Sequence, residues 1–193
     1  MVGPCEKFHF FFICVGFLLT DVSSAYSSSK KAEAALYDSE NIYLLRHALA
    51  PGTGDPDNFD VNDCDTQRNL SEEGRSQAVR IGKKLRNNLK IPPEIFSSQW
   101  CRCRETAKIL SLGHVKELPI LNSFFEKFHL KDKQTAQLKD WLFQLNNKMP
   151  IILVTHQVNI TALTEVYPSS GEIVVIRVTD LGSIQIVGRI STD

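Results

Sequence analysis

The apolar run Ile42-Tyr43-Leu44-Leu45, followed at once by Arg46 and His47, constrains the fold more than any other stretch of the chain. Four consecutive apolar residues are typical of a strand buried on both faces of a parallel sheet. Open α/β sheets bind their ligands at the carboxyl ends of such strands, which is where Arg46 and His47 would lie. Taken alone, the pair would more often be a capping arginine and a surface histidine. The rest of the chain must therefore show whether Arg46 and His47 bind a ligand.

Length and charge limit what the chain can be. Its 193 residues suit one domain beyond the N-terminal segment, and its 22 basic residues balance its 22 acidic residues. Balanced charge argues against a nucleic-acid-binding surface or a groove for a polyanion. Any anion must therefore be held locally by a few side chains, and no nucleic-acid partner is expected.

Residues 1–25 have the pattern of a secretory signal peptide. An apolar stretch from Phe8 to Leu19 has the length of an h-region. The small residues 23–25 allow cleavage before Tyr26. The alternative is an uncleaved anchor, but the run is short for a membrane span. We therefore expect a periplasmic or secreted protein with no stable membrane span after processing.

The rest of the chain alternates strands and helices. Residues 26–40 are rich in Ser, Lys and Ala, and predict a flexible lead-in to a domain over residues 41–193. Strands are expected at about 41–46, 94–98, 118–121, 151–155, 172–178 and 183–190. Helices are expected to begin near residues 71, 99, 133 and 158, and a long loop covers 48–70. This alternation predicts a three-layer α/β/α fold with a mostly parallel central sheet and helices on both faces.

Local patterns predict caps and apolar faces for three of these elements. Ser71 is a good N-cap for the first helix, and Ser98 can cap the helix that carries Arg102 in its first turn. The apolar stripe of the first helix consists of Ala78, Ile81, Leu85 and Leu89. The isoleucines expected to share one face of the last strand are Ile184, Ile186 and Ile190.

Two apolar strands end in histidine, at His47 and His156, and a third ends just before Arg102. The carboxyl ends of parallel strands lie at one edge of a sheet, so Arg46, His47, Arg102 and His156 can meet in one pocket. Two guanidinium groups and two imidazoles suit a phosphoryl dianion, since arginine binds phosphate oxygens through two parallel hydrogen bonds. A neutral imidazole can attack phosphorus and form a phosphohistidine.

The cysteines permit one disulfide in the mature chain. Cys5 and Cys14 fall in the signal segment, which leaves Cys64, Cys101 and Cys103. In an exported protein Cys64 would pair with Cys101 or Cys103, and the alternative is three reduced thiols. No metal site is expected, because the Cys-Arg-Cys spacing is unlike that of zinc ligands and the arginine would repel a cation.

Four fragments resemble the histidine phosphatase superfamily, also called phosphoglycerate mutase-like, over nearly the whole mature chain. They are Leu44-Leu45-Arg46-His47-Ala48, Leu70-Ser71-Glu72-Glu73-Gly74-Arg75-Ser76-Gln77-Ala78, Ser97-Ser98-Gln99-Trp100-Cys101-Arg102 followed by Thr106-Ala107, and Val154-Thr155-His156. The resemblance implies that His47 accepts the phosphoryl group. It also implies that Arg46, Arg102 and His156 bind its oxygens and stabilise the transition state, without metal or other cofactor.

The same resemblance suggests a proton donor between Arg102 and His156. Glu126 is the candidate, because the flanking Phe124 and Phe125 could desolvate it and raise its pKa. Asp132 and Glu105 are alternatives, and a surface glutamate is the plainer interpretation. Thr53 lies where relatives often have an asparagine that contacts phosphate, so it is a further candidate for substrate binding.

Within the superfamily, the sequence around Arg46, Cys64 and Arg102 looks like a small exported bacterial branch that resembles lipopolysaccharide-core heptose phosphatases. A cell-envelope phosphosugar is the substrate that this resemblance suggests. A bridge from Cys64 to a cysteine beside Arg102 would hold the long loop against the phosphate site, and we predict Cys64–Cys101 before Cys64–Cys103.

The sequence therefore predicts a metal-independent phosphomonoesterase that acts on a small phosphorylated substrate through a phosphohistidine on His47. One alternative is a catalytically weak relative that binds phosphoanions. Another is a phosphatase of phosphohistidine proteins, which the export signal disfavours.

Overall fold

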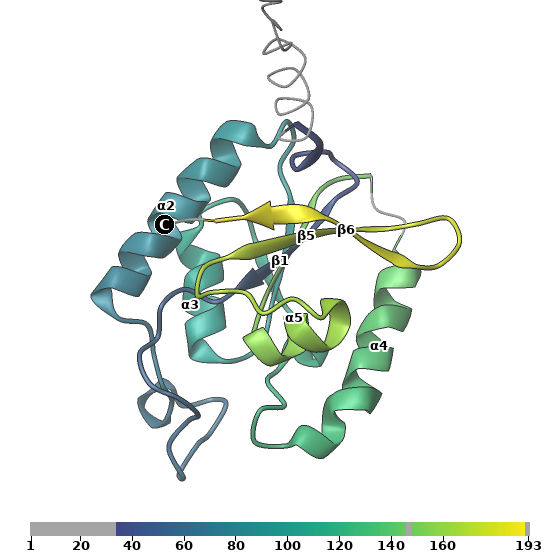
Figure 1. The fold of residues 1–193 in the computed structure, drawn as a ribbon. Coiled ribbons are helices and arrows are strands. Elements are labelled where there is room, and N and C mark those ends of the chain that lie inside the picture. The colour runs from purple at the N-terminus through teal and green to yellow at the C-terminus, as the bar shows by residue number, and fades with distance from the viewer. Residues whose placement is uncertain (1–33, 146–147, 192–193) are drawn as a thin grey trace, which may run out of the picture.

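The computed structural model describes residues 34–145 and 148–191, which form one six-stranded sheet between two helical layers (Figure 1). The predicted signal peptide lies outside the described residues. None of the helices in the described ranges is both long and apolar enough to cross a membrane.

The sheet is mostly parallel, as predicted. Its strands are β1 (Ile42–Arg46), β2 (Glu94–Ser97), β3 (Val115–Glu117), β4 (Ile151–Thr155), β5 (Ile173–Val178) and β6 (Ile184–Ile190). Their order across the sheet is β3-β2-β4-β1-β5-β6. The first four strands in that order run parallel, while β5 and β6 are antiparallel to their neighbours. Strands β1 and β4 lie at the centre, which is why both are continuously apolar.

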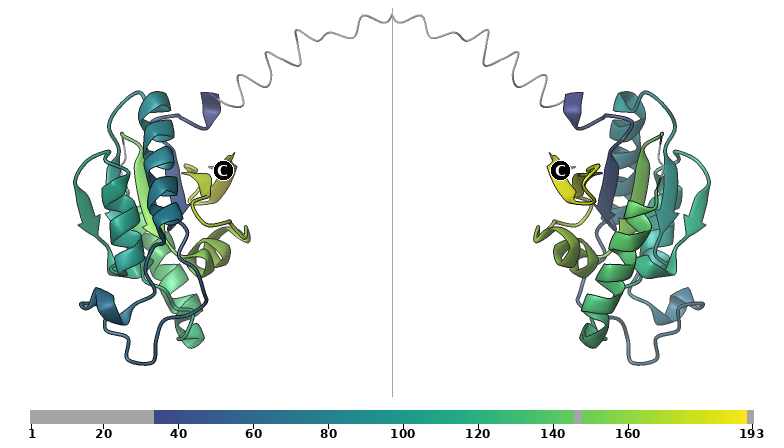
Figure 2. Two further views of the ribbon diagram at one scale, coloured as in Figure 1. Left: turned by 90° about the vertical axis from the view of Figure 1, so that its left-hand side faces the viewer. Right: turned by 90° about the vertical axis from the view of Figure 1, so that its right-hand side faces the viewer.

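Helices cover both faces of this sheet. The α-helices are α2 (Glu72–Asn88), α3 (Cys101–Ile109), α4 (Lys131–Phe143) and α5 (Gln157–Thr164). Three single 3₁₀ turns are η1 (Cys64–Thr66), η2 (Pro119–Leu121) and η3 (Phe128–Leu130). In Figure 1, α2 and α3 lie to the left of the strands and α4 lies to the right. Loop 48–70 lies at the end of the domain opposite the first described segment, residues 34–40 (Figure 2).

Side chains of β1 alternate between two hydrophobic clusters, one on each face of the sheet. Tyr43 and Leu45 pack with residues of α2 and α3, whereas Ile42 and Leu44 pack with residues of α4 and α5. Successive residues of a strand point to opposite faces, so a strand with a helical layer on each side must be apolar throughout.

Helix α2 begins as its sequence predicts. The Ser71 hydroxyl accepts a hydrogen bond from the Gly74 N–H at 3.0 Å, and two glutamates in the first turn complement the helix dipole. The predicted apolar stripe is confirmed: Ala78, Ile81 and Leu85 are buried, and Leu89 packs against the cluster that contains Ile81 and Leu85.

Two expectations near the carboxyl end of β2 are wrong. The third strand lies at Val115–Glu117, and the expected strand at 118–121 is the 3₁₀ turn η2. Pro119 opens that turn, where its missing N–H and fixed φ are tolerated. Ser98 is not the N-cap of α3, because Trp100 holds that position. The Ser98 hydroxyl instead contacts His156.

The isoleucines of β6 do not share one face. A register shift between Val175 and Ile176 interrupts the pairing of β5 with β6. Ile184 packs with the cluster of α4 and α5, while Ile190 belongs to the cluster of α2 and α3. A bulge of this kind turns the following residues to the opposite face, and simple alternation in the sequence does not reveal it.

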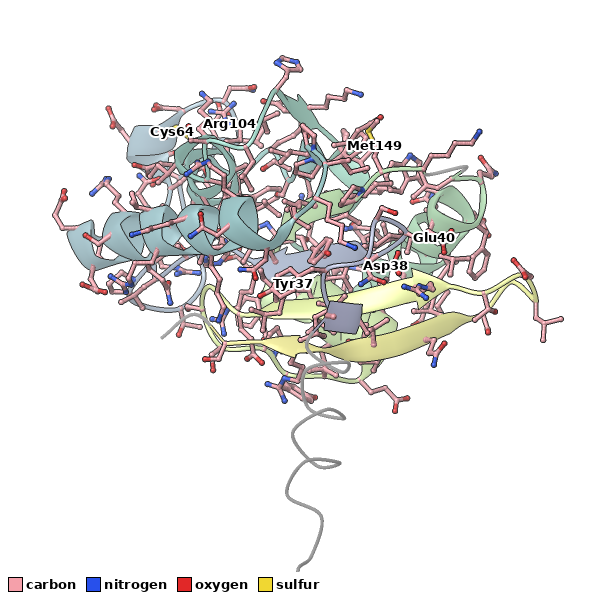
Figure 3. All side chains as sticks on the ribbon, turned by 90° about the horizontal axis from the view of Figure 1, so that it is seen from above. Tyr37, Asp38, Glu40, Cys64, Arg104 and Met149 are labelled. Carbon is pink, nitrogen blue, oxygen red and sulfur yellow. A yellow bond between two sulfur atoms is a disulfide. The ribbon has the colours of Figure 1, made fainter. Side chains whose placement is uncertain are left out.

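The described part of the expected lead-in, residues 34–40, is packed rather than free. Tyr37 is buried, and Leu36 contacts the cluster formed with α2 and α3. The Tyr43 hydroxyl donates a hydrogen bond to the Leu36 carbonyl at 2.9 Å. Figure 3 shows Tyr37, Asp38 and Glu40 beside the β5–β6 pair. The folded domain therefore begins before residue 41.

Candidate active site

All six residues predicted to act on a phosphorylated substrate line one pocket of about 260 Å³: Arg46, His47, Thr53, Arg102, Glu126 and His156. The pocket opens at the carboxyl ends of β1 and β4, where open α/β sheets place their ligands. Its remaining walls come from loop 48–70, from residues 123–127 and from the start of α5.

Strand pairing brings the two histidines together. Arg46 lies opposite Thr155 in the parallel pair of β1 with β4, and the His47 N–H donates to the Thr155 carbonyl at 3.0 Å. The residues that follow, His47 and His156, consequently emerge side by side. Their ring centroids are 5.5 Å apart, with the planes at 71°.

The His47 ring is held in one tautomer and is uncharged. Its Nδ1 lies 2.8 Å from the Ala48 carbonyl oxygen, which can only accept, so Nδ1 carries the proton and Nε2 keeps its lone pair. Burial, with the positive charge of Arg102 as the next cause, lowers the pKa of His47 to about 3. The imidazole is therefore uncharged at neutral pH.

His156 is held by groups at the base of the pocket. Its Nε2 lies 2.9 Å from the Ser98 hydroxyl, and that hydroxyl donates to the Asn122 side-chain oxygen at 3.2 Å. The serine proton is thus directed to Asn122, and His156 Nε2–H donates to Ser98. Burial, with Arg102 as the next cause, also lowers the pKa of His156 well below its usual value. The Cys103 thiol lies 3.5 Å from the same nitrogen, and burial raises its pKa to about 12.

Arg102 is fixed by a carboxylate that the sequence reading missed. Its Nη1 and Nη2 donate to the two oxygens of Asp55 at 2.6 and 3.1 Å, and both side chains are buried. Asp55 also accepts from the Trp100 indole at 2.9 Å and from the Arg68 backbone N–H at 3.0 Å. Burial alone would raise the pKa of Asp55, but its hydrogen bond and charge pairing with Arg102 hold it below the usual range.

Three guanidinium groups line the pocket. Arg46 donates from Nη1 to the Pro168 carbonyl at 2.9 Å, and Arg68 donates to the carbonyls of Gly54 and Ala50. The Nε atoms of Arg46 and Arg102 are buried and have no hydrogen-bond partner among the described residues. The Nε atom of Arg104 is also buried without a partner among the described residues, but Arg104 does not line the pocket.

Sequence-motif residues outside the pocket hold the backbone that follows His47. The Gln77 side chain accepts from the Leu49 N–H at 3.0 Å, and the Thr106 hydroxyl accepts from the Ala48 N–H at 3.1 Å. A Cβ at Gly74 would lie 2.0 Å from the Leu49 carbonyl oxygen, so only glycine allows α2 to approach this closely. These contacts fix where the strand ends and therefore where the His47 ring lies.

Among the candidate proton donors, Glu126 is the one that lines the pocket. Its Oε1 accepts from the Asp55 backbone N–H at 3.0 Å, which joins the two loops of the mouth. The expected desolvation is absent, since both Glu126 and Phe125 are exposed. Glu105 pairs with Arg75 at 2.7 Å, and neither it nor Asp132 lines the pocket. Thr53 is part of the wall.

A disulfide joins Cys64 to Cys101, the first of the two predicted pairings, and Cys103 is a buried free thiol. Figure 3 shows Cys64 beside Arg104, whose Nη2 lies 3.6 Å from the Cys64 sulfur and 3.4 Å from that of Cys101. The Cys101 N–H donates to the Gln67 side chain at 2.9 Å. Loop 48–70 is therefore tied to the first turn of α3, beside Arg102.

The sequence reading missed Asp55, Arg68 and the aromatic residues Phe59 and Trp100 as parts of the wall. Asp55 shares its loop with other acidic residues, and nothing local distinguishes it. Arg68 lies two residues before the Leu70-Ser71 motif, and this position was the one sequence signal that could have pointed to it. Among the residues that the structure describes, no three His, Cys, Asp or Glu side chains are grouped so that they could hold a metal ion.

Comparison with known proteins agrees with this geometry. The family model described as "Histidine phosphatase superfamily (branch 1)" matches residues 42–130, which include Arg46, His47 and Arg102. No curated protein matches the chain by sequence.

Similar folds occur among solved structures. The protein histidine phosphatase SixA, complexed with tungstate, aligns with a TM-score of 0.59 at 15% identity, over 79% of this chain and 97% of SixA. A putative alpha-ribazole-5'-P phosphatase from Escherichia coli gives 0.60 at 14% identity, over 77% and 95%. A phosphoserine phosphatase mutant from Entamoeba histolytica gives 0.55 at 19% identity, over 79% and 97%. The fold is phosphoglycerate mutase-like, and over residues 42–130 the chain is similar to the histidine phosphatase superfamily, which supports a phosphatase.

Proposed function

We propose that the protein is an exported, metal-independent phosphomonoesterase that hydrolyses small phosphorylated substrates through a phosphohistidine on His47. The observation that carries the proposal is the cluster of two neutral imidazoles and three guanidinium groups around one pocket at the carboxyl edge of the sheet. Such a cluster suits a phosphoryl dianion, whose charge arginine can match with fixed, planar donors.

The first step is transfer of the phosphoryl group to His47. The lone pair of Nε2 attacks phosphorus while the bond to the leaving alcohol oxygen breaks, and Nδ1 remains protonated against the Ala48 carbonyl. The low pKa of His47 keeps this lone pair available at neutral pH. Water then attacks the phosphohistidine, which releases phosphate and restores the free imidazole.

The surrounding cations stabilise the charge that develops on the phosphoryl oxygens. Arg46, Arg68 and Arg102 line the pocket, and the hydrogen bonds of Arg102 to Asp55 set its position before the substrate binds. Pre-placed positive groups of this kind are usually the largest source of acceleration, and phosphate-monoester hydrolysis needs enhancements up to about 10²¹-fold. A bound dianion also favours protonation of His156, which would then donate to a phosphoryl oxygen.

Glu126 is the proposed proton donor to the leaving alcohol and the base that later activates water. Among the carboxylates of the described pocket wall, Asp55 is unsuited, because its pairing with Arg102 keeps it ionised. Glu126 is exposed at the mouth, where a leaving group would depart. General acid–base catalysis of this kind contributes roughly 10²–10⁴-fold.

Export is part of the proposal. It is supported by the signal-like pattern of residues 1–25 and by the disulfide between Cys64 and Cys101, since disulfides persist mainly in oxidising compartments. The likeness of the motifs to lipopolysaccharide-core heptose phosphatases makes a cell-envelope phosphosugar the proposed natural substrate. Thr53 is proposed to contact the substrate, since it lines the pocket.

Two alternatives make different predictions. A weak relative would bind phosphate without turning over any phosphomonoester. A phosphatase of phosphohistidine proteins, which is what the name of SixA describes, would prefer a phosphorylated protein to small esters. A panel of small phosphomonoesters tested beside a phosphohistidine protein distinguishes the three.

The test of the proposal is turnover of an aryl phosphate by the mature chain in the presence of EDTA. His47→Ala should abolish turnover, and His114→Ala should leave it unchanged, because His114 is exposed and lies outside the pocket. Undiminished turnover by His47→Ala, or loss of activity with EDTA, would reject the mechanism.

A further inference from the structure

We propose that Phe59, Trp100 and Phe125 form a stacking subsite at the mouth of the pocket, which selects phosphomonoesters whose alcohol carries a ring. This inference rests on the proposed phosphatase function and names the class of leaving group. All three residues line the same pocket as His47 and His156.

Trp100 and Phe59 make a fixed aromatic wall. Their rings stack with centroids 4.9 Å apart and planes at 24°. The Trp100 indole N–H is bonded to Asp55 at 2.9 Å, and its ring meets the His156 ring edge-on with centroids 5.4 Å apart. The wall therefore begins at the phosphoryl cluster and extends away from it through Phe59.

Phe125 is held differently from its neighbour in the chain. Phe124 is 1% exposed and lies in the core, whereas Phe125 is 49% exposed and lines the pocket. The Phe125 N–H donates to the Ser123 hydroxyl at 3.2 Å, within the bend that turns the two rings apart. An exposed aromatic face in a pocket offers apolar surface that a ligand can bury.

The size of the pocket fits a phosphoryl group together with one ring. Sites for larger organic ligands usually measure roughly 300–1,000 Å³. At about 260 Å³ the pocket is below that range, yet it exceeds the need of a single phosphate. Phe59, Trp100 and Phe125 line this same pocket, so a ring held beside the phosphoryl group would meet aromatic side chains.

Polar groups share the mouth with these rings. Ser123, Lys127 and Gln157 also line the pocket and can bond to substituents on a ring. An aromatic alcohol and the apolar face of a sugar ring would both stack on such a wall, and both are ring faces of the same size. In both substrates a ring is attached near the ester oxygen. The experiment below distinguishes an aromatic alcohol from a sugar.

The test compares kcat/KM for two matched pairs of esters. Benzyl phosphate and ethyl phosphate are esters of primary alcohols of similar acidity that differ in the ring. Glucose 6-phosphate and sorbitol 6-phosphate differ in whether the carbon chain is closed. We expect a higher kcat/KM for the ring-containing ester than for the ring-free ester in at least one pair. The ring-containing ester with the higher kcat/KM shows whether the subsite prefers an aromatic ring or a sugar ring. Phe125→Ala should lower kcat/KM for that ester about tenfold and leave the ring-free esters within about twofold.

Phe143→Ala is the matched control, because Phe143 is 40% exposed on α4 and lies outside the pocket. It should change none of the four values. Equal rates within both pairs, or an equal effect of Phe125→Ala on ring and ring-free esters, would overturn the subsite while leaving the phosphatase function intact. Absence of turnover on all four esters and on an aryl phosphate would instead reject the proposed function.

Discussion

Asp55 and Arg102 form a buried, two-point ion pair that sets the direction of the arginine at the phosphate pocket. We predict that Asp55→Asn lowers kcat/KM about 10- to 100-fold, because small displacements of a positioning group have effects of that size. We also expect a loss of about 2 kcal/mol in the free energy of unfolding, since breaking a buried pair costs roughly 3–5 kcal/mol and asparagine keeps some hydrogen bonds. Steady-state kinetics and urea denaturation measure the two effects.

Asp57→Asn is the control for this prediction. Asp57 lies in the same loop but is exposed and outside the pocket. Its substitution should change the free energy of unfolding by no more than about 0.5 kcal/mol. It should change kcat/KM by no more than the factor of about two that corresponds to this energy. Wild-type kcat/KM in Asp55→Asn would mean that Arg102 does not need its carboxylate partner.

The disulfide should stabilise both the fold and the site. Cys64 and Cys101 are 37 residues apart, and closing a loop of that length contributes about 4 kcal/mol in the chain-entropy treatment. We expect reduction with dithiothreitol to lower the melting temperature and to raise the KM for an aryl phosphate, since loop 48–70 supplies Asp55 and Arg68. The double variant Cys64→Ser, Cys101→Ser should match the reduced protein and should not respond to dithiothreitol. A reduced protein with unchanged stability would contradict this role.

Stability should fall in mild acid because two buried histidines resist protonation. The folded-state pKa of His47 is about 3, against an ordinary value of 6.5. Between these values the unfolded chain binds more protons than the native protein, so stability rises with pH and is lost on acidification. From pH 6.5 to pH 4, His47 alone accounts for roughly 3 kcal/mol.

Urea midpoints measured from pH 7 to pH 4 test this expectation. His47→Gln should show a flatter dependence on pH than the wild type, and His114→Ala should show the wild-type slope. The range ends at pH 4 because the pKa of Asp55 is held below its ordinary 3.8, so Asp55 contributes little above that pH. An identical slope in His47→Gln would mean that His47 titrates normally in the folded protein.

Glu126→Gln should slow poor leaving groups more than good ones. A general acid matters most when the departing alkoxide is strongly basic, and its loss costs roughly 10²–10⁴-fold. We expect kcat/KM, which reports the transfer to His47, to fall by about 10²-fold or more for ethyl phosphate and by less than about tenfold for an aryl phosphate. Asp132→Asn, exposed and outside the pocket, is the control. Equal losses on both esters would exclude Glu126 as the acid.

Much of the fold could be predicted from the sequence because its central elements carry strong local signals. Few other structures fit the apolar runs of β1 and β4. The same holds for the helix after Ser71, which has a capping residue and an apolar stripe. His47 and His156 could be brought together because parallel strands place their carboxyl ends at one edge. Arg102 could be added because it lies in the first turn of the helix that follows β2.

The remainder depends on contacts that local patterns do not encode. Asp55 is one acid among several in its loop, and only the folded loop brings it to Arg102. The face switch in β6 follows from a bulge opposite Val175 and Ile176, which alternation cannot reveal. Tyr37 lies in a polar segment, yet it packs against the core beside β1. The exposure of Glu126 could not be predicted, because the sequence does not show that Phe124 turns into the core while Phe125 stays exposed.

The covalent phosphoenzyme is the most direct test of the central claim, which is that His47 carries the phosphoryl group during turnover. Wild-type protein, His47→Ala and His114→Ala would be mixed rapidly with an aryl phosphate, quenched in base and mapped by peptide mass spectrometry. A base-stable, acid-labile phosphoryl group on His47, present in wild type and His114→Ala and absent from His47→Ala, is the predicted result. Turnover without any phosphohistidine, or a phosphoryl group on another residue, would contradict it.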